Sequence, residues 1–496
     1  MGKALNNTIY YTVGAIVKAL ASFFLLPVFT NILGAAQYGI LNLLQTFSTI
    51  LAVVMTLAVE RSLYRLYYDY HIEEEQNRFL SSVFWLICIN SGVIIVLSVF
   101  LGGYIIPYIG NVDIYKVLLP VVFYTFLSAV INFSQIVMQV EQNGKQFLVI
   151  SLLILVIYNL IALTLVSFYL PTVQSMVYAS FATFFVVAPI AFFRIKKKIQ
   201  FIIDKQCILV VFRYSSPMLL MIIFAWVLNF SDRLFIANLS SYENVGVYSL
   251  AAKIVSIITL FSGTIFQAYG PFFYNIANTL PESEAKPKLR EANSTITLLV
   301  CLLGISIVLF SRTILHLFFS EEYESALPFI YLLTISAVFT QQSGLLNVMI
   351  YQNKKTLGIS LITITTGILS VVLNYWFIPI VGALFAGISN LIVGLFMISL
   401  TFMLARRNYY IEINFPLLFY GLAFILTCVA VDYMLISQWS SLVLKVLLFW
   451  GWLLLGARVN IIKQEALKRV YQAMRKNLKN TKNSSPKMGK FVDKCN

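Results

Sequence analysis

A small set of charged side chains interrupts stretches of sequence that are otherwise strongly apolar. Lys18, Lys253 and Lys445 each lie within such a stretch, and Asp232 with Arg233 ends another. A charge at the centre of a bilayer costs roughly 2.5–3.5 kcal/mol on insertion scales, so these residues are functional candidates by default. We expect Lys18 and Lys253 to line a cavity, because neither has an acidic neighbour at helical spacing and both share a helix face with polar residues.

The other charges have simpler interpretations. Asp232 and Arg233 are adjacent and near a predicted helix end, so they can form an ion pair as well as contact a ligand. Lys445 lies within reach of the outer headgroups, and we expect its long side chain to snorkel towards them.

The sign of the charges indicates what a cavity between these helices would bind. Basic groups outnumber acidic ones on the predicted inner face, where Glu60 and Glu141 lie only near the cytosolic ends. A cationic cavity with low-dielectric walls attracts anions, and phosphate or pyrophosphate is the natural occupant of a site built from lysine and arginine. Asn132, Gln135 and Gln139 share a predicted helix face and fit a hydroxylated ligand, although hydrogen bonds between helices explain them equally well.

The composition is that of a polytopic membrane protein. The chain is 60% hydrophobic and 11% charged, whereas soluble domains carry roughly 25% charged residues. A bilayer span needs about 20 apolar residues. On this criterion the sequence predicts an all-α fold of about fourteen transmembrane helices, near residues 8–31, 39–59, 79–101, 117–139, 147–170, 173–193, 209–230, 246–269, 294–316, 325–350, 357–378, 381–404, 415–436 and 439–459.

The distribution of lysine and arginine predicts the orientation. Nearly all of these residues fall in loops on one side of the fourteen-span arrangement, which places both termini in the cytoplasm. The net charge of +15 is then loop charge that faces anionic lipid headgroups, and we expect no nucleic-acid binding.

An internal repeat predicts two related lobes. Residues 38–60 align with residues 245–267 at an offset of 207, so that Gly39 falls on Gly246 and Thr46 on Lys253. We therefore predict two pseudo-symmetric six-helix lobes, related by an axis along the membrane normal, with a cavity between them. The predicted parts are an N-terminal lobe (1–205), a C-terminal lobe (206–405), two further helices (406–460) and a basic cytoplasmic tail (461–496).

The sequence disfavours an enzyme. No G-x-x-x-x-G-K-[ST] phosphate loop is present, and the only histidines, His71 and His316, fall on opposite sides of the predicted membrane. No metal-ligand spacing occurs among the five cysteines, so we expect neither a metal nor another cofactor.

Several segments, in their order and spacing, resemble one transporter family. These are residues 26–34 (LPVFTNILG), 37–40 (QYGI), 61–67 (RSLYRLY) and 245–253 (VGVYSLAAK), together with Pro217 and the Asp232-Arg233 pair. They are similar to the O-antigen flippase (Wzx-type) branch of the polysaccharide exporters, within the multidrug/oligosaccharidyl-lipid/polysaccharide (MOP) superfamily. The resemblance covers essentially residues 1–405.

That resemblance implies a function and a set of site residues. Members flip undecaprenyl-pyrophosphate-linked oligosaccharide from the cytoplasmic to the periplasmic leaflet of the bacterial inner membrane, by alternating access of two lobes. The matching positions are Arg61 and Arg65 at the cytosolic mouth, Asp232 and Arg233 in the seventh helix, and Lys253 in the eighth. Lys18 is added from the residues alone.

Three alternatives stay open. A lipid II (peptidoglycan precursor) flippase belongs to the same superfamily, whereas a cation-coupled multidrug exporter is disfavoured by the positive cavity. A membrane-bound glycan polymerase or ligase is disfavoured by the short predicted loops. A flippase for polysaccharide or lipopolysaccharide biosynthesis would have other assembly proteins as partners, such as a polymerase and a chain-length regulator.

Overall fold

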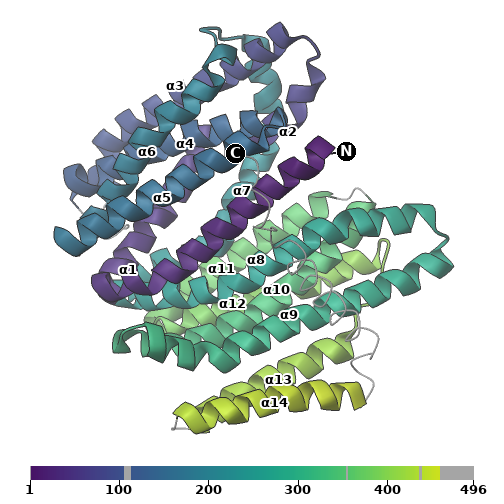
Figure 1. The fold of residues 1–496 in the computed structure, drawn as a ribbon. Helices are drawn as coiled ribbons and strands as arrows, with labels where there is room; N and C mark the ends of the chain where they lie inside the picture. The colour runs from purple at the N-terminus through teal and green to yellow at the C-terminus, as the bar shows by residue number, and fades with distance from the viewer. Residues whose placement is uncertain (1, 106–112, 354–355, 435–437, 459–496) are drawn as a thin grey trace, which may run out of the picture. The chain divides into compact units, whose positions relative to one another are not determined.

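Every regular element in the described part of the chain is helical. The structure is a computed structural model that describes residues 2–105, 113–353, 356–434 and 438–458 (Figure 1). The predicted basic tail at 461–496 lies outside these residues.

The long helices follow one another with short connections. They are α1 (Gly2–Thr56), α3 (Glu73–Ile105), α4 (Leu119–Val140), α5 (Gly144–Phe168), α6 (Val173–Ile195), α7 (Lys205–Leu239), α8 (Tyr242–Thr279), α9 (Glu282–Phe318), α10 (Leu327–Gln352), α11 (Thr356–Val381), α12 (Leu384–Arg406), α13 (Phe415–Met434) and α14 (Gln438–Arg458). Shorter elements are α2 (Glu60–Leu66), η1 (Tyr67–Asp69), η3 (Ile114–Leu118), η4 (Lys196–Lys198) and η5 (Glu321–Ala326).

Helix α1 is two helical arms joined at a kink. Its 55 residues would extend about 80 Å if straight, at 1.5 Å per residue, far more than a bilayer core of about 30 Å. Gly34 interrupts it with φ 72° and ψ 167°, a conformation that only glycine adopts without strain. The kink lies between the predicted spans at 8–31 and 39–59, so each arm has the length of one span (Figure 1).

The number of membrane-length helices differs from the predicted fourteen. Twelve helices among the described residues are long and apolar enough to cross a bilayer, and one shorter apolar helix, Lys445–Leu454, follows near the C-terminus. Two physical reasons account for the difference. The first two predicted spans form the single kinked helix α1, and the apolar described part of α14 is short.

The contacts divide the chain into two compact units. The first comprises residues 1–254, 313–336 and 356–400, and the second comprises residues 255–312, 337–355 and 401–496. The predicted lobes, with boundaries at 205 and 405, stay a prediction.

In the first unit α4 is the central helix. It packs against α6, α1, α3 and α5, and most of its residues are buried. Phe133 of α4, which is fully buried, lies 5.4 Å from the ring of Phe84 on α3. Close packing of such side chains is one of the interactions that hold helices together in a bilayer.

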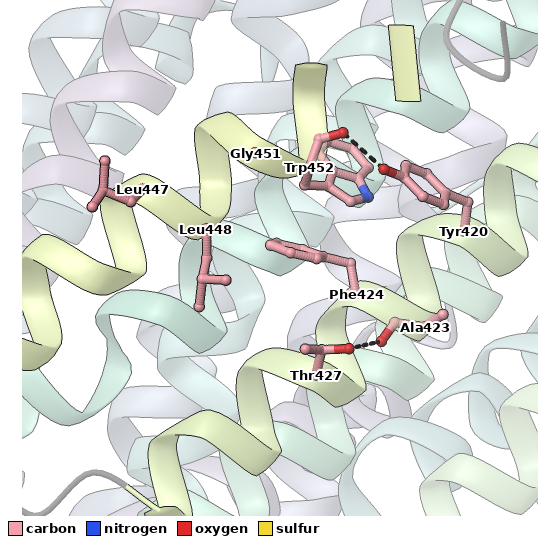
Figure 2. A pocket seen from close by; sticks show the side chains of 8 residues that line it. All are labelled: Tyr420, Ala423, Phe424, Thr427, Leu447, Leu448, Gly451 and Trp452. Atoms are coloured by element: carbon pink, nitrogen blue, oxygen red, sulfur yellow. Dashed lines mark hydrogen bonds between the residues drawn. The ribbon is translucent and has the colours of Figure 1, made fainter. Parts of the chain in front are cut away.

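In the second unit α13 and α14 pack together around aromatic rings. The rings of Tyr420 and Trp452 stack at 5.5 Å, and the Tyr420 hydroxyl donates to the Trp452 carbonyl at 2.8 Å. A mainly apolar pocket lies between the two helices (Figure 2). It is lined by Tyr420, Ala423, Phe424, Thr427, Leu447, Leu448, Gly451 and Trp452.

Candidate functional site

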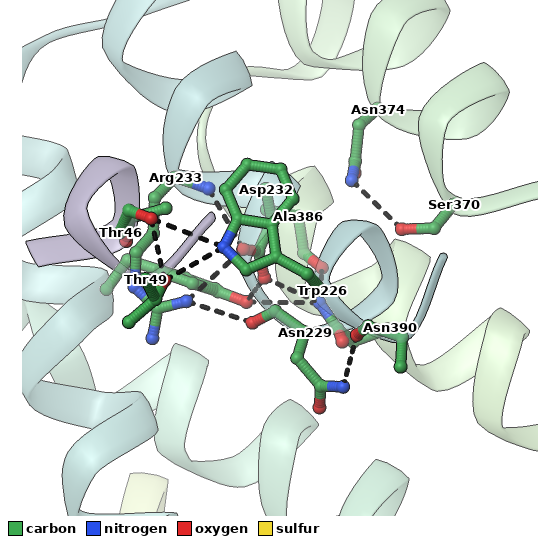
Figure 3. Close-up of polar contacts among 12 residues, drawn as sticks. Thr46, Thr49, Trp226, Asn229, Asp232, Arg233, Ser370, Asn374, Ala386 and Asn390 are labelled. Carbon is green, nitrogen blue, oxygen red and sulfur yellow. Dashed lines mark hydrogen bonds and ion pairs between the residues drawn. The ribbon is translucent and has the colours of Figure 1, made fainter. Parts of the chain in front are cut away.

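Asp232 is the centre of a buried polar cluster contributed by α7, α8 and α12 (Figure 3). Its side chain is only 4% exposed. The Tyr248 hydroxyl donates to Asp232 Oδ2, and Asn390 Nδ2 lies 3.3 Å from the same oxygen and 3.1 Å from the Tyr248 hydroxyl. Since an unpaired buried carboxylate is costly, these donors keep the charge of Asp232 tolerable within the bundle.

Arg233 adds a cation to this cluster. Its Nη1 lies 3.5 Å from Asp232 Oδ1 and donates to the Asn229 carbonyl at 3.0 Å. The guanidinium also lies over the rings of Phe230 and Tyr248, 5.3 and 5.7 Å from their centroids. The predicted ion pair of Asp232 and Arg233 is therefore present, and the aromatic rings hold the guanidinium in a fixed position.

Lys253 lies on α8 close enough to Arg233 for the two charges to interact. Its side chain is exposed, as is that of Ser256, whereas Ser249 one turn earlier is buried. The predicted polar stripe of α8 thus has one buried and two accessible members. Two cations and one carboxylate, Asp232, give this part of the first unit a net positive charge.

The remaining predicted site residues are separate from this cluster. Lys18 is half-buried on the first arm of α1, and within the described residues it forms neither an ion pair nor a hydrogen bond. Arg61 and Arg65 are both exposed on α2, where Arg65 forms an ion pair with Asp69. Within the part of the chain that the structure describes, no hydrogen bond or ion pair joins these three residues to Asp232 or Arg233.

The prediction that Lys445 snorkels to the headgroups is wrong. Its side chain is 2% exposed and its ammonium group forms an ion pair with Asp432 of α13. Asp432 also accepts from Nε of Arg312 on α9 at 2.8 Å. The physical reason is that Asp432 on the neighbouring helix α13 offers the buried Lys445 ammonium an ion pair, which directs the side chain towards α13.

A close crossing of α1 and α8 lies near the kink. A Cβ on Gly39 would lie 1.9 Å from the Tyr242 carbonyl oxygen, and one on Gly246 would lie 2.0 Å from the Ala35 carbonyl oxygen. Both 246 − 39 and 242 − 35 equal 207, the offset of the repeat, so the contact is reciprocal. Only glycine allows two backbones to approach this closely.

Further contacts fix the kinked end of α1. Glu322 Oε2 accepts from the backbone N–H of Ala35 at 2.9 Å, which satisfies one unpaired donor at the start of the second arm. The Asn31 side chain bonds to the Phe318 carbonyl at 2.9 Å and to the Ser320 N–H at 3.0 Å.

The second arm of α1 also contacts α7. Trp226 Nε1 donates to Thr49 Oγ1 at 2.9 Å and lies 3.2 Å from the Thr46 carbonyl (Figure 3). Thr46 is the residue that aligns with Lys253 in the repeat.

Sequence reasoning missed Tyr248 and Asn390 as members of the cluster. Tyr248 is within the repeated segment, and Asn390 is an amide in a predicted span, so each carried a weak polar signal. Neither signal indicated Asp232 as the partner, because the three residues come from different helices.

Comparisons with known proteins identify the family and the fold. The family model described as polysaccharide biosynthesis protein matches residues 4–277, more than half of the chain. A relative from Haemophilus influenzae, the Lsg locus putative protein 1, is 23% identical over 282 residues. That match spans 55% of this chain and 66% of the relative, slightly less than two thirds of its length.

Solved structures show the same fold. The lipid II flippase MurJ, in an inward closed conformation, is similar with a TM-score of 0.72 and 13% identity, over 92% of this chain and all of that one. A multidrug resistance MATE transporter of the MOP superfamily, in an inward-facing conformation, has a TM-score of 0.56 and 14% identity over 81% of this chain and 94% of its own. A variant of the Vibrio cholerae MATE transporter VcmN has a TM-score of 0.53 and 14% identity, with 82% and 96% covered.

These similarities confirm the predicted all-α polytopic membrane fold. This chain therefore belongs to the polysaccharide biosynthesis protein family, and its fold is similar to those of the solved MurJ and MATE transporters.

Proposed function

We propose that this protein flips an undecaprenyl-pyrophosphate-linked oligosaccharide from the cytoplasmic to the periplasmic leaflet of the bacterial inner membrane. The observation that carries the proposal is the pair of neighbouring cations, Arg233 and Lys253, within an apolar helical bundle. A pyrophosphate that crosses such a bundle needs positive groups to replace its hydration, and arginine offers several N–H donors in one plane.

Asp232 would act as a positioning residue in this clamp. Its carboxylate forms an ion pair with Nη1 of Arg233 and accepts hydrogen bonds from Tyr248 and Asn390. The guanidinium is thereby kept in one orientation, with further N–H groups left for a phosphate. Lys18, Arg61 and Arg65 would extend the positive path towards the cytoplasmic entrance.

Alternating access of two six-helix lobes would move the substrate. The reciprocal crossing of Gly39 and Gly246 joins the two copies of the repeat near the kinked end of α1. With the predicted topology, in which both termini are cytoplasmic, that end faces the periplasm. The contacts there support a state that is closed on the periplasmic side, and outward opening must break them.

A lipid II flippase is the nearest alternative, since its substrate has the same pyrophosphate linkage. The positive clamp does not distinguish the two substrates, whereas the polysaccharide biosynthesis family match favours the first. A cation-coupled drug exporter would need a negative cavity, which the net charge of the Asp232, Arg233 and Lys253 group argues against.

The proposal is tested by locating the lipid-linked glycan in cells that carry defined variants. Deletion of the gene should leave this glycan on the cytoplasmic leaflet. Arg233→Ala and Lys253→Ala should each abolish surface glycan while the folded protein stays at its normal level. Lys286→Ala, which removes an exposed lysine paired with Glu282, is the matched control and should keep surface glycan.

Two outcomes would contradict this assignment. Normal surface glycan in both clamp variants would remove the proposed role of the cations. Loss of peptidoglycan synthesis in the deletion strain, with the surface polysaccharide unchanged, would favour the lipid II alternative.

A further inference from the structure

The central helix α4 has one accessible polar stripe. Helices α1, α2, α3, α5 and α6 all pack against α4, and most of its residues are buried. Asn132 is nevertheless exposed, and Gln135 and Gln139 are half-buried. Amides on a helix surrounded by protein do not face acyl chains, because lipid cannot satisfy their hydrogen bonds. This stripe therefore faces a hydrated region of the N-terminal helices.

A strained turn directs α2 towards this stripe. Leu57 and Ala58 have φ values of 51° and 54°, which side chains with a Cβ rarely adopt. The turn ends α1, and the chain then continues into α2 and η1. Glu60, Tyr64 and Tyr68 follow at intervals of four residues, so they lie on one helical face.

Contacts join that face to α4. Asn132 Nδ2 donates to Glu60 Oε1 at 2.7 Å, and the Tyr64 hydroxyl donates to Gln139 Oε1. The Tyr68 hydroxyl donates to the Val140 carbonyl at 2.7 Å. The rings themselves stay open, since Tyr64 is 47% exposed and Tyr68 is 52% exposed. Each phenol is thus fixed at its hydroxyl while its face is free to contact a ligand.

The first arm of α1 adds a buried hydroxyl at the same place. Tyr11 lies near both Tyr64 and Tyr68. Its hydroxyl is shielded from solvent and has no hydrogen-bond partner among the described residues. Such a group is costly unless something satisfies it, which points to a polar ligand or water.

The chemistry of these groups differs from that of the cationic clamp. A carboxylate at Glu60 repels a phosphate, and the amides make the surface too polar for a polyprenyl chain. A sugar fits both properties, because its hydroxyls donate to carboxylate and amide oxygens while its C–H face packs on an aromatic ring.

We propose that Glu60, Tyr64, Asn132 and Gln139, with Tyr11 beside them, form a sugar-binding subsite for the glycan part of the substrate. The inference rests on the proposed function, since it places the two halves of one lipid-linked substrate. Tyr11 and Lys18 lie seven residues apart on one face of α1, about 10 Å along the helix. Sugars at Tyr11 and Tyr64 would therefore lie beside Lys18, on the positive path proposed for the pyrophosphate.

Saturation-transfer NMR on the purified full-length protein tests the subsite. The probes are the methyl glycosides of glucose, galactose, rhamnose and N-acetylglucosamine, with inorganic pyrophosphate measured in parallel. We expect at least one glycoside to contact the wild-type protein, and Tyr64→Ala to weaken its binding about tenfold. Tyr375→Ala, which removes an exposed tyrosine of α11, is the matched control and should bind as the wild type does.

Two further variants separate a direct contact from a structural effect. Tyr64→Phe keeps the ring and should retain most of the binding, whereas Glu60→Gln should alter which glycosides bind. Melting temperatures close to that of the wild type show that the variants fold. Equal glycoside binding by Tyr64→Ala and Tyr375→Ala, or no contact between any glycoside and the wild type, overturns the subsite.

The same data separate this inference from the proposed function. Pyrophosphate binding should persist in Tyr64→Ala and be lost in Arg233→Ala. If the wild type binds a glycoside through Tyr64 but does not bind pyrophosphate, the subsite stands and the pyrophosphate clamp fails.

Discussion

Adding a single methyl group at Gly246 should shift the conformational equilibrium of this protein. In Gly246→Ala the new Cβ would lie 2.0 Å from the Ala35 carbonyl oxygen, whereas ordinary contact begins near 3.4 Å. The two helices must therefore separate by about 1.4 Å at their crossing. The atom that the new Cβ meets belongs to the helix backbone, so the clash cannot be relieved by rotation of a side chain.

The magnitude follows from the cost of overpacking. An extra methyl in a close-packed contact costs about 1–3 kcal/mol. The crossing must break in any state that opens at this end, so the cost falls on the state described here. A difference of 1–3 kcal/mol corresponds to a shift of roughly 5- to 150-fold in the populations of the two states.

Cross-linking at the kink measures that shift. Asn31→Cys and Ser320→Cys, in a background without the native cysteines, place thiols on two neighbouring residues, since the Ser320 backbone N–H donates to Asn31 Oδ1 at 3.0 Å. A short bifunctional reagent should link them efficiently with Gly246 present and several-fold more slowly in Gly246→Ala. Gly263→Ala is the matched control, because a Cβ at Gly263 on the same helix meets nothing within 4 Å.

The reasoning would be refuted by equal cross-linking rates in Gly246→Ala and Gly263→Ala. Loss of cross-linking through unfolding is recognised by a large fall in the melting temperature. In that case Gly39→Ala, which meets the equivalent carbonyl of Tyr242 in the other copy of the repeat, provides a second test of the same crossing.

Two predictions concern stability. Asp432→Ala should destabilise the protein by about 3–5 kcal/mol, since it leaves the buried Lys445 ammonium without this carboxylate; Asp432→Leu combined with Lys445→Met should recover most of the loss in thermal melting. Burial raises the pKa of the Glu60 carboxyl, although the Asn132 hydrogen bond and the Arg61 charge oppose this. Folding then favours the protonated form, so the melting temperature should fall as pH rises from the ordinary glutamate pKa through the raised one, and Glu60→Gln should remove this dependence.

The membrane-spanning character of this chain is a local property of its sequence. A helix in lipid satisfies its backbone hydrogen bonds internally, so each apolar stretch predicts a span without reference to its neighbours. The kink of α1 at Gly34 lies between two such apolar stretches, residues 8–31 and 39–59, each of which predicts a span. The ion pair of Asp232 and Arg233 was also predictable, because the two residues are adjacent in the chain.

The partners of those charges were decided by the tertiary structure. Tyr248 is 16 residues from Asp232 and Asn390 is 158 residues away, and only the packing of α7, α8 and α12 brings them together. Lys445 shows the same limit, since Asp432 lies on another helix and converts a lysine expected at the headgroups into a buried ion pair. Sequence alone determines which segments enter the bilayer, because transfer free energy is summed along the chain. Which side chains then meet depends on how the helices pack, a property of the whole bundle.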